Sequence, residues 1–163
     1  MRRTIAARFL GIVTTALLAA GCAGTPTKEP PTDVRTGPAA EVRDSVARLA
    51  LSMVGVQYRY GGASPDEGFD CSGLVYYAYM QNGQAVPRTS QAQFGAATPI
   101  PLAEATPGDL LFFRDQEKLS HVGIYLGDGE FVHAPSTGDS VRVASIEAPY
   151  YRQNLVAVGR LIP

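Results

Sequence analysis

Nucleophilic chemistry in this sequence would fall to very few residues. One cysteine, Cys71, lies in a patterned segment, and the chain has two histidines, His121 and His133. The run CSGLVYYAYMQ and the NG pair after it predict a helix over 71–81. With Asp70 as its N-cap, Cys71 occupies the first turn, where unpaired N–H groups and the helix dipole favour a thiolate. Cys71 is therefore a candidate nucleophile, with N–H groups nearby to stabilise an oxyanion.

Both histidines fall in one stretch, SHVGIYLGDGEFVHA, which predicts a β-hairpin. If its loop is 127–129, Leu126 faces Glu130, and His121 and His133 lie on one sheet face as a diagonal pair, roughly 7–8 Å apart. A loop of two residues would place them on opposite faces. The alternation of apolar residues does not choose between the two loops.

The shared face suggests a division of labour between the histidines. One would take the proton of the Cys71 thiol and later give a proton to a leaving amine, while the other holds the first in position. Gly123, opposite His133, would leave room for the first imidazole.

Two other interpretations of these residues stay open at this point. Cys71 could be a buried structural cysteine, and isolated strand histidines usually have no catalytic role. Cys71, His121 and His133 could also form a zinc site with one open position, although no Cys-x-x-Cys or His-x-x-x-His spacing supports it.

Helices early in the chain and strands later must position these residues. Helical periodicity covers 41–55 and 71–81, and a third short helix is expected in PRTSQAQF, capped by Thr89 or Ser90. Strands are predicted at 109–114, 120–126, 130–134, 140–145 and 155–162. Consecutive strands after consecutive helices indicate an α+β fold with a central antiparallel sheet of about five to six strands.

Composition narrows the class of protein. The chain has 163 residues, of which 45% are hydrophobic and 18% charged, as expected for one globular domain. The formal net charge is −1, and no basic block is long enough to follow a phosphate backbone. We therefore expect no nucleic-acid partner.

The first residues have the pattern of an export signal. Residues 1–21 carry three arginines followed by a short apolar run, as in a secretory signal peptide. The signal ends in LLAAGC, which resembles a bacterial lipobox and predicts lipidation of Cys22. An ordinary cleaved signal is the alternative, and a disulfide between Cys22 and Cys71 is a further one for an exported protein.

Residues 22–39 are rich in proline and contain a single large aliphatic side chain. Such a segment cannot bury enough apolar surface to fold, so we expect a disordered tether behind the lipidated Cys22. Fully extended, it would reach about 60 Å. The folded domain is then predicted at 40–163.

Several motifs, in order, resemble the NlpC family of papain-like cysteine peptidases, which act on bacterial cell-wall peptides. The matching segments are YRYGG at 58–62, FDCSGLV at 69–75, PRTSQAQ at 87–93, PGDLLFF at 107–113, HVGIYLGDGEFVHA at 121–134 and the closing GRLIP. The combination of the cysteine motif with the histidine hairpin is specific, whereas any one segment alone is weak.

The resemblance implies a papain-like arrangement and a role for each matching residue. It makes Cys71 the nucleophile, His121 the general base and His133 the orienting third member, with no metal or cofactor. The family's tyrosine upstream of the cysteine falls on Tyr58, beside the oxyanion site.

Three further residues are expected near the substrate. Ser72 is small enough to let a substrate carbonyl approach the oxyanion site. Arg88 and Ser90 match the family's substrate groove, although capping a helix is an equal alternative for Ser90.

The resemblance also implies a substrate and a location. Family members hydrolyse amide bonds in peptidoglycan, either between D-Glu and diaminopimelate or in the D,D cross-bridge. An acyltransferase or amidase with the same triad, or a non-catalytic wall-binding lipoprotein, are the alternatives. The lipid would anchor the protein in the cell envelope, and Ala23 after the cysteine implies the periplasmic face of the outer membrane. Some restraint of the activity is expected, by limited access, by a regulatory protein or by proteolysis, but no residues point to it.

Overall fold

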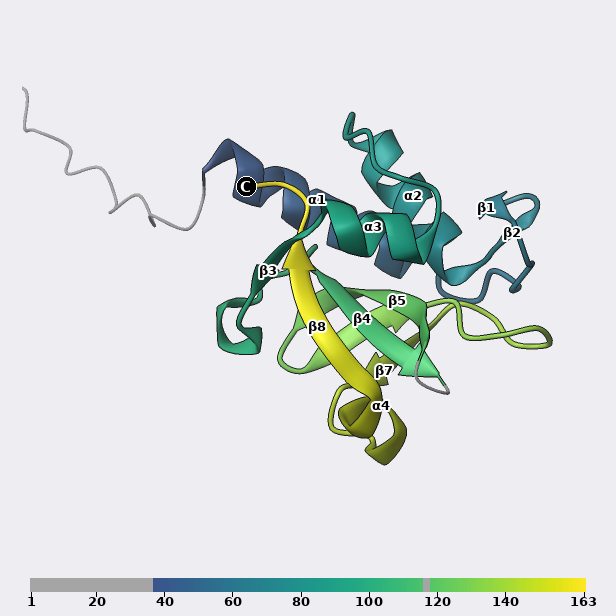
Figure 1. Ribbon diagram of the computed structural model, residues 1–163. Coiled ribbons are helices and arrows are strands. Elements are labelled where there is room, and N and C mark those ends of the chain that lie inside the picture. The colour runs from purple at the N-terminus through teal and green to yellow at the C-terminus, as the bar shows by residue number, and fades with distance from the viewer. Residues whose placement is uncertain (1–36, 116–117) are drawn as a thin grey trace, which may run out of the picture. The chain divides into compact units, whose positions relative to one another are not determined.

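The computed structural model of the protein describes residues 37–115 and 118–163 (Figure 1). The predicted signal peptide at 1–21, Cys22 and nearly all of the tether at 22–39 lie outside the described residues, and their predictions stay predictions. The tether does not extend to residue 39, because helix α1 begins at Pro38. Within the described ranges, no helix is long and apolar enough to cross a membrane.

Three helices precede the main sheet and a fourth lies between its last two strands. They are α1 (Pro38–Ser52), α2 (Cys71–Gln81), α3 (Ser90–Ala96) and α4 (Pro149–Asn154), with a short 3₁₀ helix η1 at Leu102–Glu104. The bounds predicted for α2 are confirmed. Ser90 is not the cap of α3, because the Thr89 hydroxyl accepts the N–H of Ala92 and makes Thr89 the N-cap.

Six antiparallel strands form the central sheet in the order β3-β8-β4-β5-β6-β7. They are β3 (Thr98–Ile100), β4 (Leu110–Asp115), β5 (Lys118–Gly127), β6 (Glu130–His133), β7 (Arg142–Ser145) and β8 (Leu155–Arg160). A separate pair joins β1 (Ala63–Ser64) to β2 (Gly68–Phe69). The predicted α+β class and strand number are confirmed.

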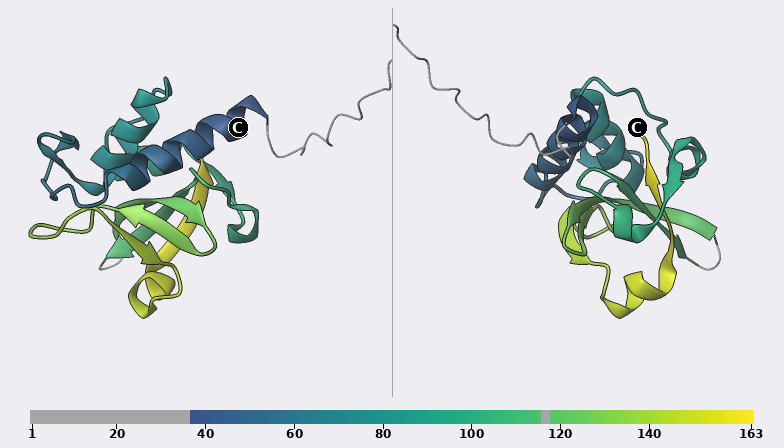
Figure 2. Two further views of the ribbon diagram at one scale, coloured as in Figure 1. Left: turned by 180° about the vertical axis from the view of Figure 1, so that it is seen from behind. Right: turned by 90° about the vertical axis from the view of Figure 1, so that its left-hand side faces the viewer.

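The two faces of the sheet carry different layers (Figures 1 and 2). Helices α1, α2 and α3 cover one face, where Phe112, Val122 and Val132 join the helix residues in one buried core. Helix α4 lies on the other face, where Phe113 and Phe131 belong to a second, aromatic cluster. Because side chains alternate along a strand, each strand contributes to both cores.

The β5–β6 hairpin combines features of both predicted loops. Gly127 pairs with Glu130 around a tight turn at Asp128-Gly129, both of which have positive φ. The prediction that Leu126 faces Glu130 is therefore wrong. An irregularity between Tyr125 and Gly127 then shifts the register by one residue, as a β-bulge does. The shift restores the pairing that puts both histidines on one face.

Candidate active site

Asp70 organises the start of helix α2. Its Oδ1 accepts the Gly73 N–H at 2.6 Å and the Ser72 hydroxyl at 3.1 Å, while Oδ2 accepts the Gly61 N–H at 2.9 Å. The predicted N-cap is confirmed, and Cys71 is the first residue of the helix.

Arg88 completes this cluster from the loop before α3. Its guanidinium donates to both Asp70 carboxylate oxygens, at 3.0 and 2.9 Å, and to the Ser72 hydroxyl and the Gly62 carbonyl. Burial acts to raise the pKa of Asp70, but the hydrogen bonds from Arg88 and Gly73 bring it below its ordinary value. The polar groups of Arg88 and Ser72 are thus engaged with the helix start.

The segment before β1 packs directly on this helix start. A Cβ added to Gly73 would lie 2.0 Å from the Gly62 carbonyl oxygen, so the two backbones touch only because glycine is present. This approach brings Tyr58 close enough to Cys71 for their charges to interact. Burial first, and then the charge of Cys71, raise the pKa of the Tyr58 hydroxyl.

The sulfur of Cys71 lies against the backbone of β5 on both sides of His121. Sγ is 3.9 Å from the Ser120 carbonyl oxygen, and the Val122 N–H is directed at the sulfur. The helix start and the histidine strand therefore meet at this point, although they are 49 residues apart in the chain.

The resting thiol is not activated in the way that its position at the helix start suggests. Burial raises the pKa of Cys71 above its ordinary value, and the Asp70 carboxylate raises it further, while the N–H groups of Val122 and Ser72 oppose them. The prediction of a lowered thiol pKa is wrong because it counted the helix N–H groups but neither the burial nor the charge of the cap.

The two imidazoles are hydrogen bonded to each other. His121 Nε2 lies 2.8 Å from His133 Nδ1, and His133 Nε2 lies 3.1 Å from the hydroxyl of Tyr151. Nδ1 is thus the ring nitrogen of His121 that remains to exchange a proton with a thiol or a substrate. His133 has no exposed surface, which fixes its ring between its two partners.

Aromatic rings surround His133. The Phe131 and Tyr151 rings lie 5.0 and 5.3 Å from the imidazole, centroid to centroid. A Cβ on Gly123 would lie 2.5 Å from the Phe131 ring. The prediction that Gly123 leaves room for an imidazole is wrong, because Phe131 fills that space and packs on His133.

Both imidazoles are neutral at neutral pH. Burial lowers the pKa of His121 to about 4, and Arg142 contributes. Burial, His121 and Arg142 together lower the pKa of His133 to about 3. A thiol with a raised pKa therefore lies near histidines with lowered ones, so the resting site holds a neutral thiol and neutral imidazoles.

The geometry argues against the zinc interpretation. His121 Nε2 and His133 Nδ1 face each other at hydrogen-bond distance, so these two nitrogens cannot both bind one metal ion. No group of three His, Cys, Asp or Glu in residues 37–115 and 118–163 could hold a metal. Cys71 is a free thiol in the described structure.

Tyr151 is the site residue that the sequence analysis did not find. It lies on α4, a helix of six residues that begins at Pro149, too short to show a helical repeat. Proline at the first turn was the only available signal. Of the predicted residues, Cys71, Tyr58 and the histidines come together, while Ser90 begins α3 next to the Arg88 loop.

Comparisons with known proteins identify the family of this chain. Residues 55–160 match the NlpC/P60 family. The chain is 40% identical over 117 residues to the murein DD-endopeptidase MepH of Escherichia coli, covering 69% of this chain and 43% of the relative. It is 39% identical to the bifunctional muramidase/DL-endopeptidase CwlT of Bacillus subtilis, covering 72% and 36%. The chain thus spans less than half the length of these curated relatives.

Solved structures show the same fold. The NlpC/p60 domain of the peptidoglycan hydrolase SagA has a TM-score of 0.64 and 34% identity, covering 72% of this chain and 97% of that one. A lipoprotein-like NLP/P60 protein from Staphylococcus aureus has a TM-score of 0.68 and 35% identity, covering 76% and 42%. With the matched region extending over most of the described residues, the chain belongs to the NlpC/P60 family.

Proposed function

We propose that the protein is a peptidoglycan endopeptidase that hydrolyses an amide bond in stem peptides or their cross-bridges. The names of its relatives, a murein DD-endopeptidase and a DL-endopeptidase among them, support this class of substrate. The observation that carries the proposal is the 2.8 Å contact between His121 and His133. On either side of His121, the β5 backbone at Ser120 and Val122 contacts the Cys71 sulfur.

In the first half-reaction, His121 Nδ1 takes the proton of the Cys71 thiol as the sulfur attacks the scissile carbonyl carbon. The N–H groups at the start of α2 stabilise the resulting oxyanion. The C–N bond then breaks, His121 gives its proton to the leaving amine, and the acyl group remains on Cys71 as a thioester. In the second half-reaction, His121 takes a proton from water, the hydroxide attacks the thioester, and the protonated thiol is released.

His133 and Tyr151 prepare His121 for its charged state. The Nε2–H of the His121 imidazolium needs an acceptor. His133 Nδ1, 2.8 Å away, can accept only when the proton of the His133 ring is on Nε2. In that tautomer the His133 Nε2–H donates to the Tyr151 hydroxyl oxygen, which gives the buried proton a hydrogen-bond acceptor. Tyr151 is in this account a positioning residue that acts through His133.

Digestion of purified cross-linked muropeptides by the full-length protein tests the proposal. Mass spectrometry should show a new amine and a new carboxyl terminus with the wild type, and no products with Cys71→Ala. Cys22→Ser is the matched control, because it removes the other cysteine and leaves the triad in place. Untouched muropeptides with both the wild type and this control would contradict the proposal.

A lipid at Cys22 would keep this activity in the cell envelope, and we include it in the proposal. It predicts that the wild type partitions into detergent micelles and that Cys22→Ser does not. Equal partitioning of the two proteins would exclude the lipid anchor at Cys22, and the proposed endopeptidase reaction would still stand.

A further inference from the structure

A cavity of about 480 Å³ opens beside the two histidines. Its walls come from β5, β6, β7, the loop between β6 and β7, and α4. They include Ser120, His121, His133, Asp139, Arg142 and Tyr150. A larger cavity, of about 870 Å³, lies between the start of α1 and η1 and contains none of the site residues. The smaller one is the space that the chemistry can use, and we call it the leaving-group cavity.

The residues that line the leaving-group cavity indicate which part of the substrate it would hold. Among the described residues, the lining includes His121 but not Cys71, Asp70 or Tyr58. In the proposed reaction the acyl group stays on the sulfur beside the helix start, whereas the amine takes its proton from His121. The cavity on the histidine side is therefore where the amino acid of the leaving amine would lie.

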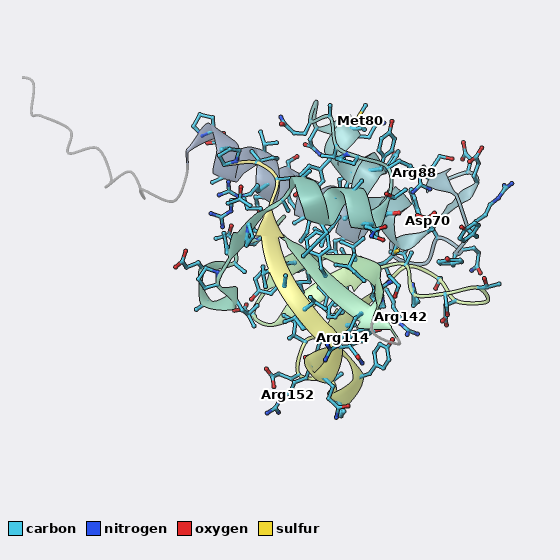
Figure 3. All side chains as sticks on the ribbon, in the orientation of Figure 1. Asp70, Met80, Arg88, Arg114, Arg142 and Arg152 are labelled. Atoms are coloured by element: carbon cyan, nitrogen blue, oxygen red, sulfur yellow. The ribbon has the colours of Figure 1, made fainter. Side chains whose placement is uncertain are left out.

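Arg142 is the cation of this cavity. It pairs directly with His133 across β6 and β7, and residues opposite each other on antiparallel strands have their side chains on the same face. Its positive charge helps to keep both imidazoles neutral, which requires the guanidinium to be near them. Figure 3 shows the Arg142 side chain below Asp70 and Arg88, on the side of the sheet toward α4.

The charge of Arg142 is only partly balanced within the protein. Its guanidinium lies 3.5 Å from Asp139, and the two side chains are 50% and 41% exposed, so solvent weakens this pair. Asp139 also accepts a hydrogen bond from Ser136. Arg142 therefore keeps donors that a bound anion could use, and arginine is well suited to bind a carboxylate through two hydrogen bonds.

We propose that the leaving-group cavity binds the amino acid that carries the leaving amine, and that Arg142 binds the free carboxylate next to that amine. The inference rests on the proposed endopeptidase function. Such a carboxylate is two bonds from the nitrogen protonated by His121, which matches a cation beside the histidines.

This carboxylate distinguishes the two bonds in peptidoglycan. In a D,D cross-bridge, the leaving diaminopimelate centre bears a free carboxylate next to the scissile nitrogen. In the bond from D-Glu to diaminopimelate of a longer stem, the corresponding carboxyl is tied up in the next peptide bond. The cavity therefore favours the cross-bridge as the substrate.

Two cross-linked muropeptides test the inference: one with the carboxylate next to the scissile nitrogen free, and one with it amidated. Wild-type full-length protein should cut the free form with a kcat/KM about 10- to 100-fold higher, the range of a charge-assisted hydrogen-bonded pair. Arg142→Gln should bring this ratio close to one, mainly through KM, and Arg142→Lys should restore part of it. Arg152→Gln, at an exposed arginine on α4, should leave the ratio unchanged.

The ratio of kcat/KM for the free and the amidated muropeptide distinguishes a failure of the inference from a failure of the proposed function. A change in histidine pKa or in folding caused by Arg142→Gln affects both substrates alike and cancels in the ratio. If the wild type cuts both forms equally, or if Arg142→Gln keeps the preference, the inference is wrong while the endopeptidase function stands. If the wild type cuts neither, the proposed function fails, and the inference with it.

Discussion

The Tyr151 hydroxyl lies 3.1 Å from the one ring nitrogen of His133 that His121 does not use. Through the imidazole of His133, which has no exposed surface, the contact connects α4 to His121 on β5. Two tautomers of His133 are chemically possible, and only the one protonated at Nε2 leaves Nδ1 as an acceptor for His121.

Tyr151→Phe should therefore lower kcat about 10-fold, roughly the effect of one lost hydrogen bond, with little change in KM. Without the hydroxyl oxygen, the Nε2–H of the tautomer that His121 requires is buried with no acceptor. Tyr125→Phe is the matched control. It removes a tyrosine hydroxyl from the same aromatic core, one that accepts the Gly129 N–H near the hairpin turn, away from the histidines. Steady-state kinetics and thermal unfolding of both variants check this. Equal kcat in the two would mean that Tyr151 only packs.

Arg88 should matter more for stability than for substrate binding. Arg88→Met leaves the Asp70 carboxylate, whose side chain is only 13% exposed, without its cation. We expect the free energy of unfolding to fall by about 1.5–3 kcal/mol, with KM nearly unchanged. Denaturant unfolding and muropeptide kinetics measure the two effects.

The double variant Asp70→Asn/Arg88→Met should lose less stability than the sum of the single variants, because each single change leaves a partly buried charge unpaired. A large rise in KM with unchanged stability would instead support the substrate-groove role that the family resemblance implies for Arg88.

The sequence predicted those parts of the site that depend on interactions between residues close together in the chain. Asp70 before Cys71 and the turn residues of the histidine hairpin have short-range signals, and the helix and the hairpin follow from them. The bulge near Tyr125 was not predictable, because the choice between two registers depends on how the hairpin packs in the sheet.

The features that were missed depend on contacts between distant segments. Strand β3 contains Pro99, which argues against a strand unless the strand lies at a sheet edge, as it does here beside β8. Tyr151 reaches His133 only because α4 packs on the sheet. The raised thiol pKa of Cys71 comes from burial and from Asp70, and burial is a property of the whole fold.

Alkylation of Cys71 should follow a raised pKa. We expect the rate of reaction with iodoacetamide to reach half its maximum at a higher pH than that of an exposed cysteine in a model peptide measured alongside. Cys22→Ser provides the background, so that only one thiol reacts. Adding Asp70→Asn should move the midpoint to lower pH, because the carboxylate charge raises the thiol pKa. A midpoint in the acid range would instead indicate a resting thiolate–imidazolium pair.

The histidines should make folding stability decrease as the pH falls from 7 to 5. Their folded pKa values, about 4 and about 3, lie below the ordinary 6.5. As the pH falls below 6.5, the histidines of the unfolded chain therefore bind protons while those of the folded protein stay neutral. The stabilising contribution is thus present above pH 6.5 and is lost as the pH falls toward these folded values. Each imidazole that stays neutral contributes a slope of up to about 1.4 kcal/mol per pH unit.

Denaturant unfolding of the full-length protein between pH 7 and pH 5 measures this slope. The chain has only these two histidines, and Asp70, whose lowered pKa also links stability to pH, acts only near and below its ordinary value of 3.8. His133→Asn should therefore reduce the slope, since one of the two buried imidazoles is gone. An unchanged slope in this variant, or a flat profile in the wild type, would show that the imidazoles take up protons in the folded state. The lowered pKa of at least one histidine would then be wrong, because its folded pKa would lie close to the ordinary 6.5.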